Sequence, residues 1–418
     1  MTKRIVRWLA FLALLVAGGP AAAYPLDASE QTGIARLEAY SLAREPLVEN
    51  GTLKPGSLLP SADVPLTLFG KHFRMPEPDA ALTQKIRELL GADAAHYGIS
   101  LLDITDPDNP RYAEINGNAT QNPGSVGKIM VALGWFQALA DLHPNDIDRR
   151  RKILFETQIT ANDFIVRDSH VVPMWKPGDP KVVRRPIEIG DTANIWTWLD
   201  WMCSASSNAA ASQLISELML LRKFGADYPP SSAEAVAYFS STPKAELSRA
   251  LREAIEAPLT RNGLDIGSLR QGSFFTRTGK SLVPGNSSYA SSNELLHFLV
   301  LMEQGKLVDY FSSLQIKKLL YLTDVRIRYA ASPALFDAAV YFKSGSLYSC
   351  RPEAGYECGK YRGNKWNYLS SIAIVENHIT KPEVRYIAVV QSNVLKKNSA
   401  DEHLNLATLI QGLIEQDH

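Results

Sequence analysis

A hydroxyl and an amine stand one helical turn apart in the stretch Asn122-Pro-Gly-Ser125-Val-Gly-Lys128. Pro and Gly break the preceding segment, and apolar residues recur at helical spacing from Ile129 onward, which predicts a buried helix beginning near Ser125. Residues three apart share one face of a helix. A serine hydroxyl is a poor nucleophile without a base, and a lysine can serve as that base only if burial or nearby cations lower its pKa. The pair therefore predicts a nucleophile and a base, provided that the rest of the chain buries them.

Two further short motifs follow in order. Ser206-Ser207-Asn208 lies between two predicted helices, and Lys343-Ser344-Gly345 lies on a predicted strand. Together the three motifs resemble the active-site set of the penicillin-binding protein and serine β-lactamase superfamily, which is Ser-x-x-Lys, Ser-x-Asn and Lys-Thr/Ser-Gly. The resemblance spans roughly residues 79–416 and does not cover 24–75.

The resemblance implies a catalytic role for several of these residues. Ser125 would be the acylated nucleophile, Lys128 its base, and Ser206 a relay that carries the proton to the leaving nitrogen. The oxyanion hole would combine the backbone N–H of Ser125 with one just past the third motif, near Ser346.

The same resemblance implies a substrate-binding role for the others. Asn208 would bind the amide side chain of the substrate and hold the lysine, and Lys343 and Ser344 would suit a substrate carboxylate. Gly345 would let a substrate pair with the strand without a side-chain clash.

Context separates this set from other matches to the same short patterns. Ser241-Thr-Pro-Lys244 also reads Ser-x-x-Lys, but it follows the Ser-x-Asn motif and contains a proline. Ser291-Ser-Asn293 reads better as the N-cap of an apolar helix, and Arg277-Thr-Gly279 lies in a predicted loop. One self-consistent set remains.

The resemblance is incomplete at the step that would free the serine. Class A β-lactamases carry a Glu-x-x-Leu-Asn motif whose Glu activates the deacylating water. The nearest match here is Glu256-Ala-Pro-Leu-Thr260, with Thr in place of Asn. Glu256 is therefore a weak candidate for a deacylation base, and without such a base an acyl-enzyme would persist.

The elements that must position these motifs change type along the chain. Strands are expected at both ends of the sequence, over 97–104, 111–115, 338–347, 366–375 and 384–392, whereas helices fill the middle. Helices from Asp79 and from Asp401 flank these strands, and Asp191 is expected to cap the helix that leads toward Ser206. We expect an α/β fold of the α+β type, with one antiparallel sheet built from both termini and an all-helical part inserted over about 140–335.

The N-terminus reads as a secretory signal peptide over residues 1–23. Lys3, Arg4 and Arg7 precede a short apolar run, and Ala21-Ala-Ala23 offers small residues for cleavage. We therefore expect secretion to the periplasm or the extracellular space, an N-terminal extension over 24–75, and a catalytic domain over 76–418. With 44 basic and 44 acidic residues, the zero net charge argues against a general nucleic-acid surface.

The cysteine and histidine patterns give no sign of a metal or an organic cofactor. The eight histidines are scattered and no Cys-x-x-Cys pair exists, so a zinc site is poorly supported. Cys350 and Cys358 are close in a polar loop and could form a disulfide in an oxidising compartment, which would leave Cys203 as a buried free thiol.

The sequence thus predicts a secreted serine hydrolase that forms an acyl-enzyme through Ser125 with β-lactams or related amides. A D-alanyl-D-alanine carboxypeptidase or endopeptidase acting on peptidoglycan is an alternative of the same class. A penicillin-binding-like wall protein that binds peptidoglycan without turnover is an alternative of another class, and an esterase on the same fold stays open.

Overall fold

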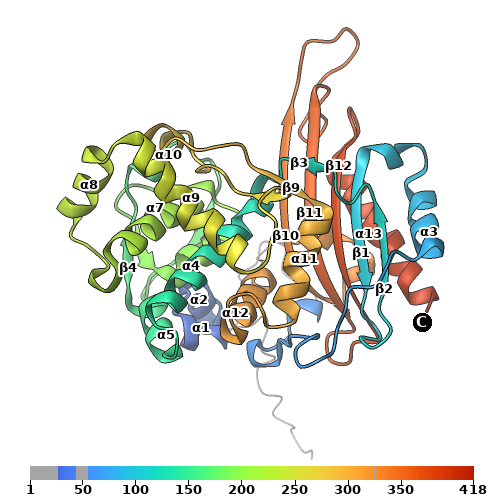
Figure 1. Ribbon diagram of the computed structural model, residues 1–418, viewed down its shortest axis with the longest axis horizontal. Coiled ribbons are helices and arrows are strands. Elements are labelled where there is room, and N and C mark those ends of the chain that lie inside the picture. Colours follow the sequence, from blue (N-terminus) through green and yellow to red (C-terminus); the bar gives the residue numbers. More distant parts are fainter. Residues whose placement is uncertain (1–26, 44–54, 324–325) are drawn as a thin grey trace, which may run out of the picture.

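A five-stranded antiparallel sheet joins the two ends of the chain (Figure 1). The computed structural model describes residues 27–43, 55–323 and 326–418, so the predicted signal peptide lies outside the described residues. The strand order is β10-β11-β12-β1-β2, with β1 Tyr97–Asp103, β2 Arg111–Ile115, β10 Ala339–Ser349, β11 Trp366–Asn377 and β12 Val384–Asn393. The predicted single antiparallel sheet and the α+β fold are confirmed.

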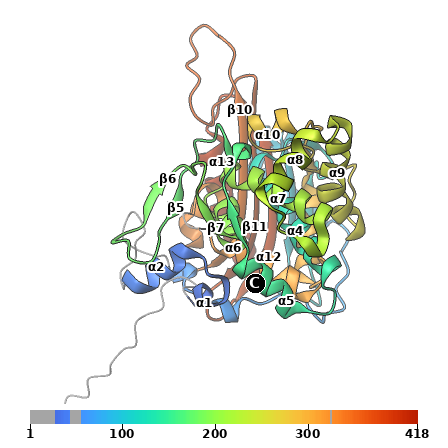
Figure 2. The same cartoon turned by 90° about the vertical axis from the view of Figure 1, so that its left-hand side faces the viewer.

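Helices cover both faces of this sheet (Figures 1 and 2). One face packs against α3 Ala80–Leu90 and α13 Ser399–Gln416, through a core that includes Leu82, Ile86 and Ile410. The other face packs against α11 Ser292–Glu303 and α12 Tyr310–Tyr321, which connect it to the helical region. Both faces of the sheet are therefore covered by helices. This explains why every residue of β1 is buried and most of them are apolar.

The helical region fills the space beside the sheet. It contains α4 Lys128–Leu142, α5 Ile147–Glu156, α6 Ile195–Cys203, α7 Asn208–Phe224, α8 Ser232–Ser241, α9 Lys244–Arg261 and α10 Arg277–Leu282. Short antiparallel strands interrupt these helices: β4 Gln158–Thr160 with β7 Thr192–Asn194, β5 Val172–Met174 with β6 Val183–Arg185, and β9 Tyr289–Ser291 with β8 Leu269–Arg270 and β3 Thr120–Gln121. The part expected to be all-helical thus also carries short extended segments. None of the helices in the described ranges is both long and apolar enough to cross a membrane.

Helix caps follow the sequence signals at some ends and not at others. Asp79 accepts from the N–H of Leu82 and caps α3, as predicted. The prediction that Asp191 caps the helix leading to Ser206 is wrong. Asn194 caps α6, and the Asp191 carboxylate instead binds the Arg185 guanidinium, because the β4–β7 strand pair delays the start of the helix.

The segment assigned to an N-terminal extension is tied into the helical region. Its helices α1 Ala28–Thr32 and α2 Ala35–Ala43 bury Ile34 and Leu37 in the main core. The Arg36 guanidinium, itself 1% exposed, binds both carboxylate oxygens of Asp200 on α6 at 2.6 and 2.8 Å. It also donates to the carbonyl of Leu322. This buried ion pair fixes α6 just before the chain reaches Ser206.

Substitution of Asp200 by Ala should lower the free energy of unfolding by about 3–5 kcal/mol, because it removes the carboxylate that binds the buried Arg36 guanidinium at two oxygens. Chemical denaturation followed by circular dichroism measures the loss. Asp148→Ala is the matched control, since Asp148 pairs with Arg151 on the surface and little change is expected. Equal losses in the two variants would show that the buried pair does not hold α6.

Candidate active site

Ser125 lies in a tight turn wedged between a buried helix and the sheet. The 3-10 turn Gly124–Gly127 runs directly into α4, whose residues are buried almost all round, from Lys128 to Ala140. That burial explains why the helix sequence is apolar on every face. The turn contacts β10, so the nucleophile is held where the helical region meets the sheet.

Lys128 is fully buried at the first turn of α4, with its amine at the centre of the site. Its Nζ lies 2.8 Å from Ser125 Oγ, 2.6 Å from the carbonyl oxygen of Ser206 and 2.8 Å from Asn208 Oδ1. The first and second predicted motifs therefore meet at one nitrogen atom. Ser207 caps α7, and Asn208 is the first helical residue.

The three partners of Lys128 all accept hydrogen bonds from its amine: the Ser206 carbonyl, Asn208 Oδ1 and Ser125 Oγ. The first two oxygens can only accept, so they would keep both N–H bonds of a deprotonated amine. Loss of the third proton would leave a lone pair directed at the Ser125 hydroxyl. A neutral amine in this position can take the serine proton directly.

The surroundings of Lys128 favour that neutral form. Burial lowers its pKa well below the usual value, and the nearby charge of Lys343 acts in the same direction. The ring of Phe275 lies 4.8 Å from the amine in a cation–π contact, which by itself favours the charged form. The carboxylate of Asp168 opposes the shift but does not contact the amine, because it binds the hydroxyl of Ser207 and the N–H of Ala209.

Ser206 links the two lysines. Lys343 donates to Ser206 Oγ at 2.8 Å, and the same oxygen lies 3.5 Å from Lys128 Nζ. Burial, together with the positive charge of the neighbouring Arg328, lowers the pKa of Lys343 to about 7. Ser206 adopts a left-handed backbone conformation with φ of 59°, which is uncommon for a residue with a side chain. Its hydroxyl is thus placed to pass a proton between the first and third motifs.

Gly345 is required by the close approach of β10 to the nucleophile turn. A Cβ added to Gly345 would lie 2.2 Å from the carbonyl oxygen of Pro123 and 2.3 Å from the nitrogen of Ser125. From the other side, a Cβ on Gly124 would lie 3.0 Å from the nitrogen of Ser346. The two facing glycines therefore bring together the two backbone N–H groups that were predicted to form an oxyanion hole.

Arg328 is a site residue that the motifs did not indicate. Its guanidinium donates to Ser344 Oγ at 2.7 Å, to Ser346 Oγ at 3.0 Å and to the hydroxyl of Tyr361 at 3.1 Å. Arg328 lies in a loop of ordinary composition before β10, and only its contacts with the third motif identify it. With Lys343, it makes this end of the site strongly positive.

Two cavities meet at Ser125. One, of about 490 Å³, is lined by Ser125, Ser206, Asn208, Arg328, Lys343, Ser344, Gly345, Ser346, His170, Lys360 and Tyr361, among others. The second, of about 830 Å³, shares Ser125, Asn208 and Ser346 and is lined by amide, hydroxyl and phenyl side chains, with Lys280 as its cation. Every predicted site residue except Lys128, which is buried behind Ser125, thus borders the first cavity.

Comparisons with solved structures agree with this geometry. The chain matches PBP-A over 82% of its own length and 99% of that protein, at 13% identity and a TM-score of 0.51. It matches the acyl-enzyme complex of a PBP-A mutant with penicillin G at 12% identity and a TM-score of 0.52, covering 82% of this chain and 100% of that one. A class A β-lactamase from Bacteroides cellulosilyticus matches at 14% identity and a TM-score of 0.50, covering 82% and 98%. No family model and no curated protein sequence matches the chain.

The chain has the fold of the penicillin-binding protein and serine β-lactamase superfamily. Within the superfamily fold, its three motifs stand where the nucleophile turn, the interhelical loop and the β10 strand meet. The other pattern matches lie elsewhere: Ser241 ends α8, Ser291 caps α11, and Arg277 begins α10.

Glu256, the weak candidate for a superfamily-type deacylation base, borders neither cavity. It lies on α9, where burial raises its pKa and one carboxylate oxygen is buried without a partner. No Asp or Glu side chain is among the described residues that line the two cavities. Among the described residues, the lining of these cavities therefore offers no carboxylate that would activate a deacylating water.

His170 is a further ionisable group at the first cavity that sequence reasoning missed. Its Nδ1 lies 2.6 Å from the carboxylate of Asp168, which orients the ring. Burial opposes ionisation of Asp168, but hydrogen bonds from His170 and from the N–H of Ala209 lower its pKa to about 2. Across the described ranges, no cluster of three or more His, Cys, Asp or Glu residues could hold a metal ion.

Gly345→Ala should reduce labelling of Ser125 by a fluorescent penicillin by roughly 100-fold or more, because the added methyl group displaces the nucleophile turn by a large fraction of an ångström. The labelling rate measures this effect. Gly412→Ala on α13, where nothing lies within 4 Å of the added atom, is the control and should label like the wild type. A Gly345→Ala protein that labels normally would show that the turn and β10 do not constrain each other.

Proposed function

We propose that this protein is a serine hydrolase that forms an acyl-enzyme through Ser125 with β-lactams or related amides. The contact between Ser125 Oγ and the buried amine of Lys128 carries the proposal, because it joins a nucleophile to a base of lowered pKa. The superfamily fold supports the same chemistry, and a PBP-A mutant of this fold forms an acyl-enzyme with penicillin G.

Each step of acylation has a residue in reach. Ser125 Oγ attacks the substrate carbonyl while Lys128 takes the hydroxyl proton. The backbone N–H groups of Ser125 and Ser346 donate hydrogen bonds to the carbonyl oxygen and so stabilise the negative charge that develops on it. Ser206, which accepts a hydrogen bond from Lys343, then delivers a proton to the leaving nitrogen.

The positive end of the cavity determines which substrates fit. Lys343, Arg328 and the hydroxyls of Ser344 and Ser346 suit a carboxylate on the leaving-group side. Asn208 borders both cavities and suits the amide of the acyl side chain. A β-lactam carboxylate and the C-terminal carboxylate of a peptide both meet this requirement.

One observation favours a second candidate, a D-alanyl-D-alanine carboxypeptidase or endopeptidase acting on peptidoglycan. Because no carboxylate lines the described cavities, a penicilloyl-enzyme has no evident base for its release. An acyl-enzyme that persists with β-lactams is the expected behaviour of a penicillin-binding enzyme. The long polar cavity beside Ser125 also suits a peptide acyl group.

We also propose that the protein acts outside the cytoplasm, in the periplasm or the extracellular space. The signal-peptide pattern of residues 1–23 supports this location. The Cys350–Cys358 disulfide fits an oxidising compartment, and Cys203 is the free, buried cysteine, as the sequence suggested.

Intact-mass spectrometry after incubation with benzylpenicillin and with nitrocefin tests the proposal. We expect the wild type to gain one covalent adduct that persists, with slow nitrocefin turnover. Ser125→Ala should form no adduct, and Lys128→Ala should acylate roughly 10²–10⁴ times more slowly because the general base is lost.

The chain supplies matched controls for this experiment. Ser241→Ala removes the serine of the second Ser-x-x-Lys match and should leave acylation unchanged, and Glu256→Gln should leave release unchanged. Folded wild-type protein that forms no adduct and turns over no substrate would contradict the acyl-enzyme proposal. Fast nitrocefin turnover would instead favour β-lactamase activity over the peptidase candidate.

A further inference from the structure

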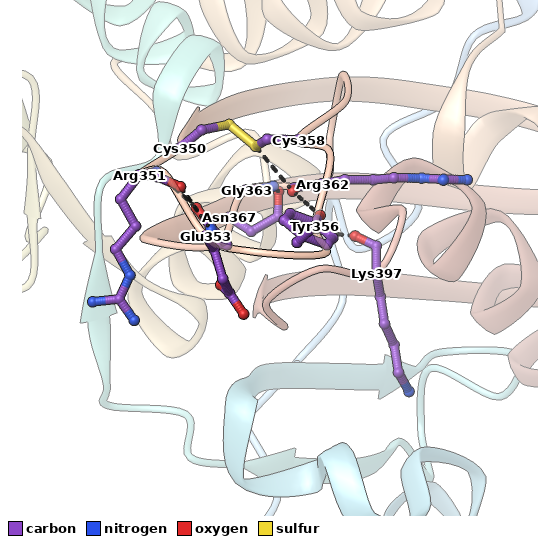
Figure 3. The surroundings of a disulfide bond; sticks show 10 residues. Cys350, Arg351, Glu353, Tyr356, Cys358, Arg362, Gly363, Asn367 and Lys397 are labelled. Atoms are coloured by element: carbon purple, nitrogen blue, oxygen red, sulfur yellow. Dashed lines mark hydrogen bonds between the residues drawn. A yellow bond between two sulfur atoms is a disulfide. The ribbon is translucent and has the colours of Figure 1, made fainter.

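A disulfide-stapled arm borders the positive end of the cavity. The arm comprises residues 349–366, which connect β10 to β11 and rise above the rest of the molecule (Figures 1 and 2). Cys350 follows β10 directly and is bonded to Cys358, three residues before Tyr361 (Figure 3). The staple thus shortens the free length of chain between the end of the strand and Tyr361.

The base of the arm is also bound to the start of α13. The carbonyl of Tyr361 accepts from the N–H of Ser399, and the carbonyl of Gly363 accepts from the N–H of Lys396. Asn367 accepts from the N–H of Gly363 and donates to the carbonyl of Lys397, and Figure 3 shows these residues beside the disulfide. Tyr361 is therefore fixed from both directions, although it lies in a loop.

Tyr361 contacts Arg328 in two ways. Its hydroxyl accepts from the guanidinium at 3.1 Å, and its ring lies 4.9 Å from the guanidinium carbon. On its other side, the ring packs edge-on against Tyr348 at the end of β10. The Tyr361 side chain is thus the link between the arm and the arginine that borders the cavity.

Three of the seven non-glycine residues with a left-handed φ among the described residues border this cavity. Ser206, Arg328 and Tyr361 have φ values of 59°, 53° and 62°, in the left-handed region that is costly for residues with side chains. Such conformations persist where the surrounding structure over-determines them and often occur at functional sites.

The contacts of Arg328 also orient two hydroxyl groups. Ser344 Oγ and Ser346 Oγ both accept from the guanidinium, so each must direct its own O–H elsewhere. Both residues border the cavity. An anion in the cavity can then accept hydrogen bonds from the hydroxyls of Ser344 and Ser346, which the Arg328 guanidinium polarises. It can also accept one from Lys343.

We propose that Tyr361 is a positioning residue for substrate recognition: it holds Arg328 so that Ser344 and Ser346 donate to the substrate carboxylate, and the stapled arm exists to place it. The inference rests on the proposed function for the identity of the ligand, a β-lactam or peptide carboxylate. It adds that carboxylate selectivity depends on an arm that lies outside the three motifs.

Binding to a protein that cannot be acylated separates this inference from the proposed function. In the Ser125→Ala background, calorimetry compares the affinity for benzylpenicillin with that for its methyl ester, which lacks the carboxylate. We expect the parent to prefer the free acid. Tyr361→Phe should reduce that preference by about threefold to tenfold, the effect of one typical lost hydrogen bond, with affinity for the ester unchanged.

Two further variants sharpen the comparison. Tyr356→Phe removes a hydroxyl of the same arm that bonds the carbonyl of Arg362 rather than Arg328, and it should keep the full preference. The double variant Cys350→Ser with Cys358→Ser should lose preference in the same direction as Tyr361→Phe. Circular dichroism checks that each protein is folded.

The inference is overturned if Tyr361→Phe keeps the preference of the parent, or if it weakens the acid and the ester equally, as a merely structural role would. A parent that binds the acid no better than the ester also overturns it. Absence of acylation in the wild type, together with selective binding that depends on Tyr361, would instead contradict the proposed function and leave the positioning role supported.

Discussion

The structure depends on removing the amine of Lys128 from water without giving it a counter-charge. A buried ammonium without a carboxylate in contact is costly, so burial lowers the pKa of Lys128 well below its usual value. The environment of Lys317 is different. Lys317, equally buried, contacts Glu303 and Glu376, and its pKa is raised rather than lowered. Among the described residues no carboxylate contacts Lys128, and its proposed role as a base depends on that difference.

The fold supplies that environment from three separate parts of the chain. The apolar helix α4 buries the lysine stem, the loop before α7 supplies the oxygen of Ser206, the first residue of α7 supplies that of Asn208, and β10 brings the second lysine, Lys343. Close contact between Gly124 and Gly345 sets the distance between the nucleophile turn and the strand. The ion pair between Arg36 and Asp200 anchors the helix that precedes the loop.

Much of this arrangement could be predicted from the sequence because the motifs are local and the periodicity is strong. The strands at both ends follow from the residue pattern, whereas the meeting of Ser125, Ser206 and Lys343 follows from the resemblance of the three motifs to a known active-site set. Long-range contacts could not be read in this way. Arg328 and Tyr361 come from loops of ordinary composition, and only the folded chain brings them to the third motif. The cap at Asn194 was missed because a short strand pair, rather than the nearest acidic residue, decides where α6 begins.

The role of Gly345 also became clear only in three dimensions. The sequence suggested space for a substrate, whereas the structure shows that the glycine is already required by the backbone of Pro123 and Ser125. Likewise, Glu256 matched a motif fragment but lies on α9 outside both cavities. The deacylating half of the reaction is therefore the part that the sequence predicted least well.

The protonation state of Lys128 tests the account most directly. Carbon-13 nuclear magnetic resonance of lysines labelled at the ε-carbon follows the titration of Lys128 in the folded protein. The Lys128→Arg variant identifies the signal of Lys128. The account predicts a pKa well below the usual lysine value of 10.5, with a neutral amine available to accept the proton of Ser125. A Lys128 that titrates at or above the usual value would contradict it.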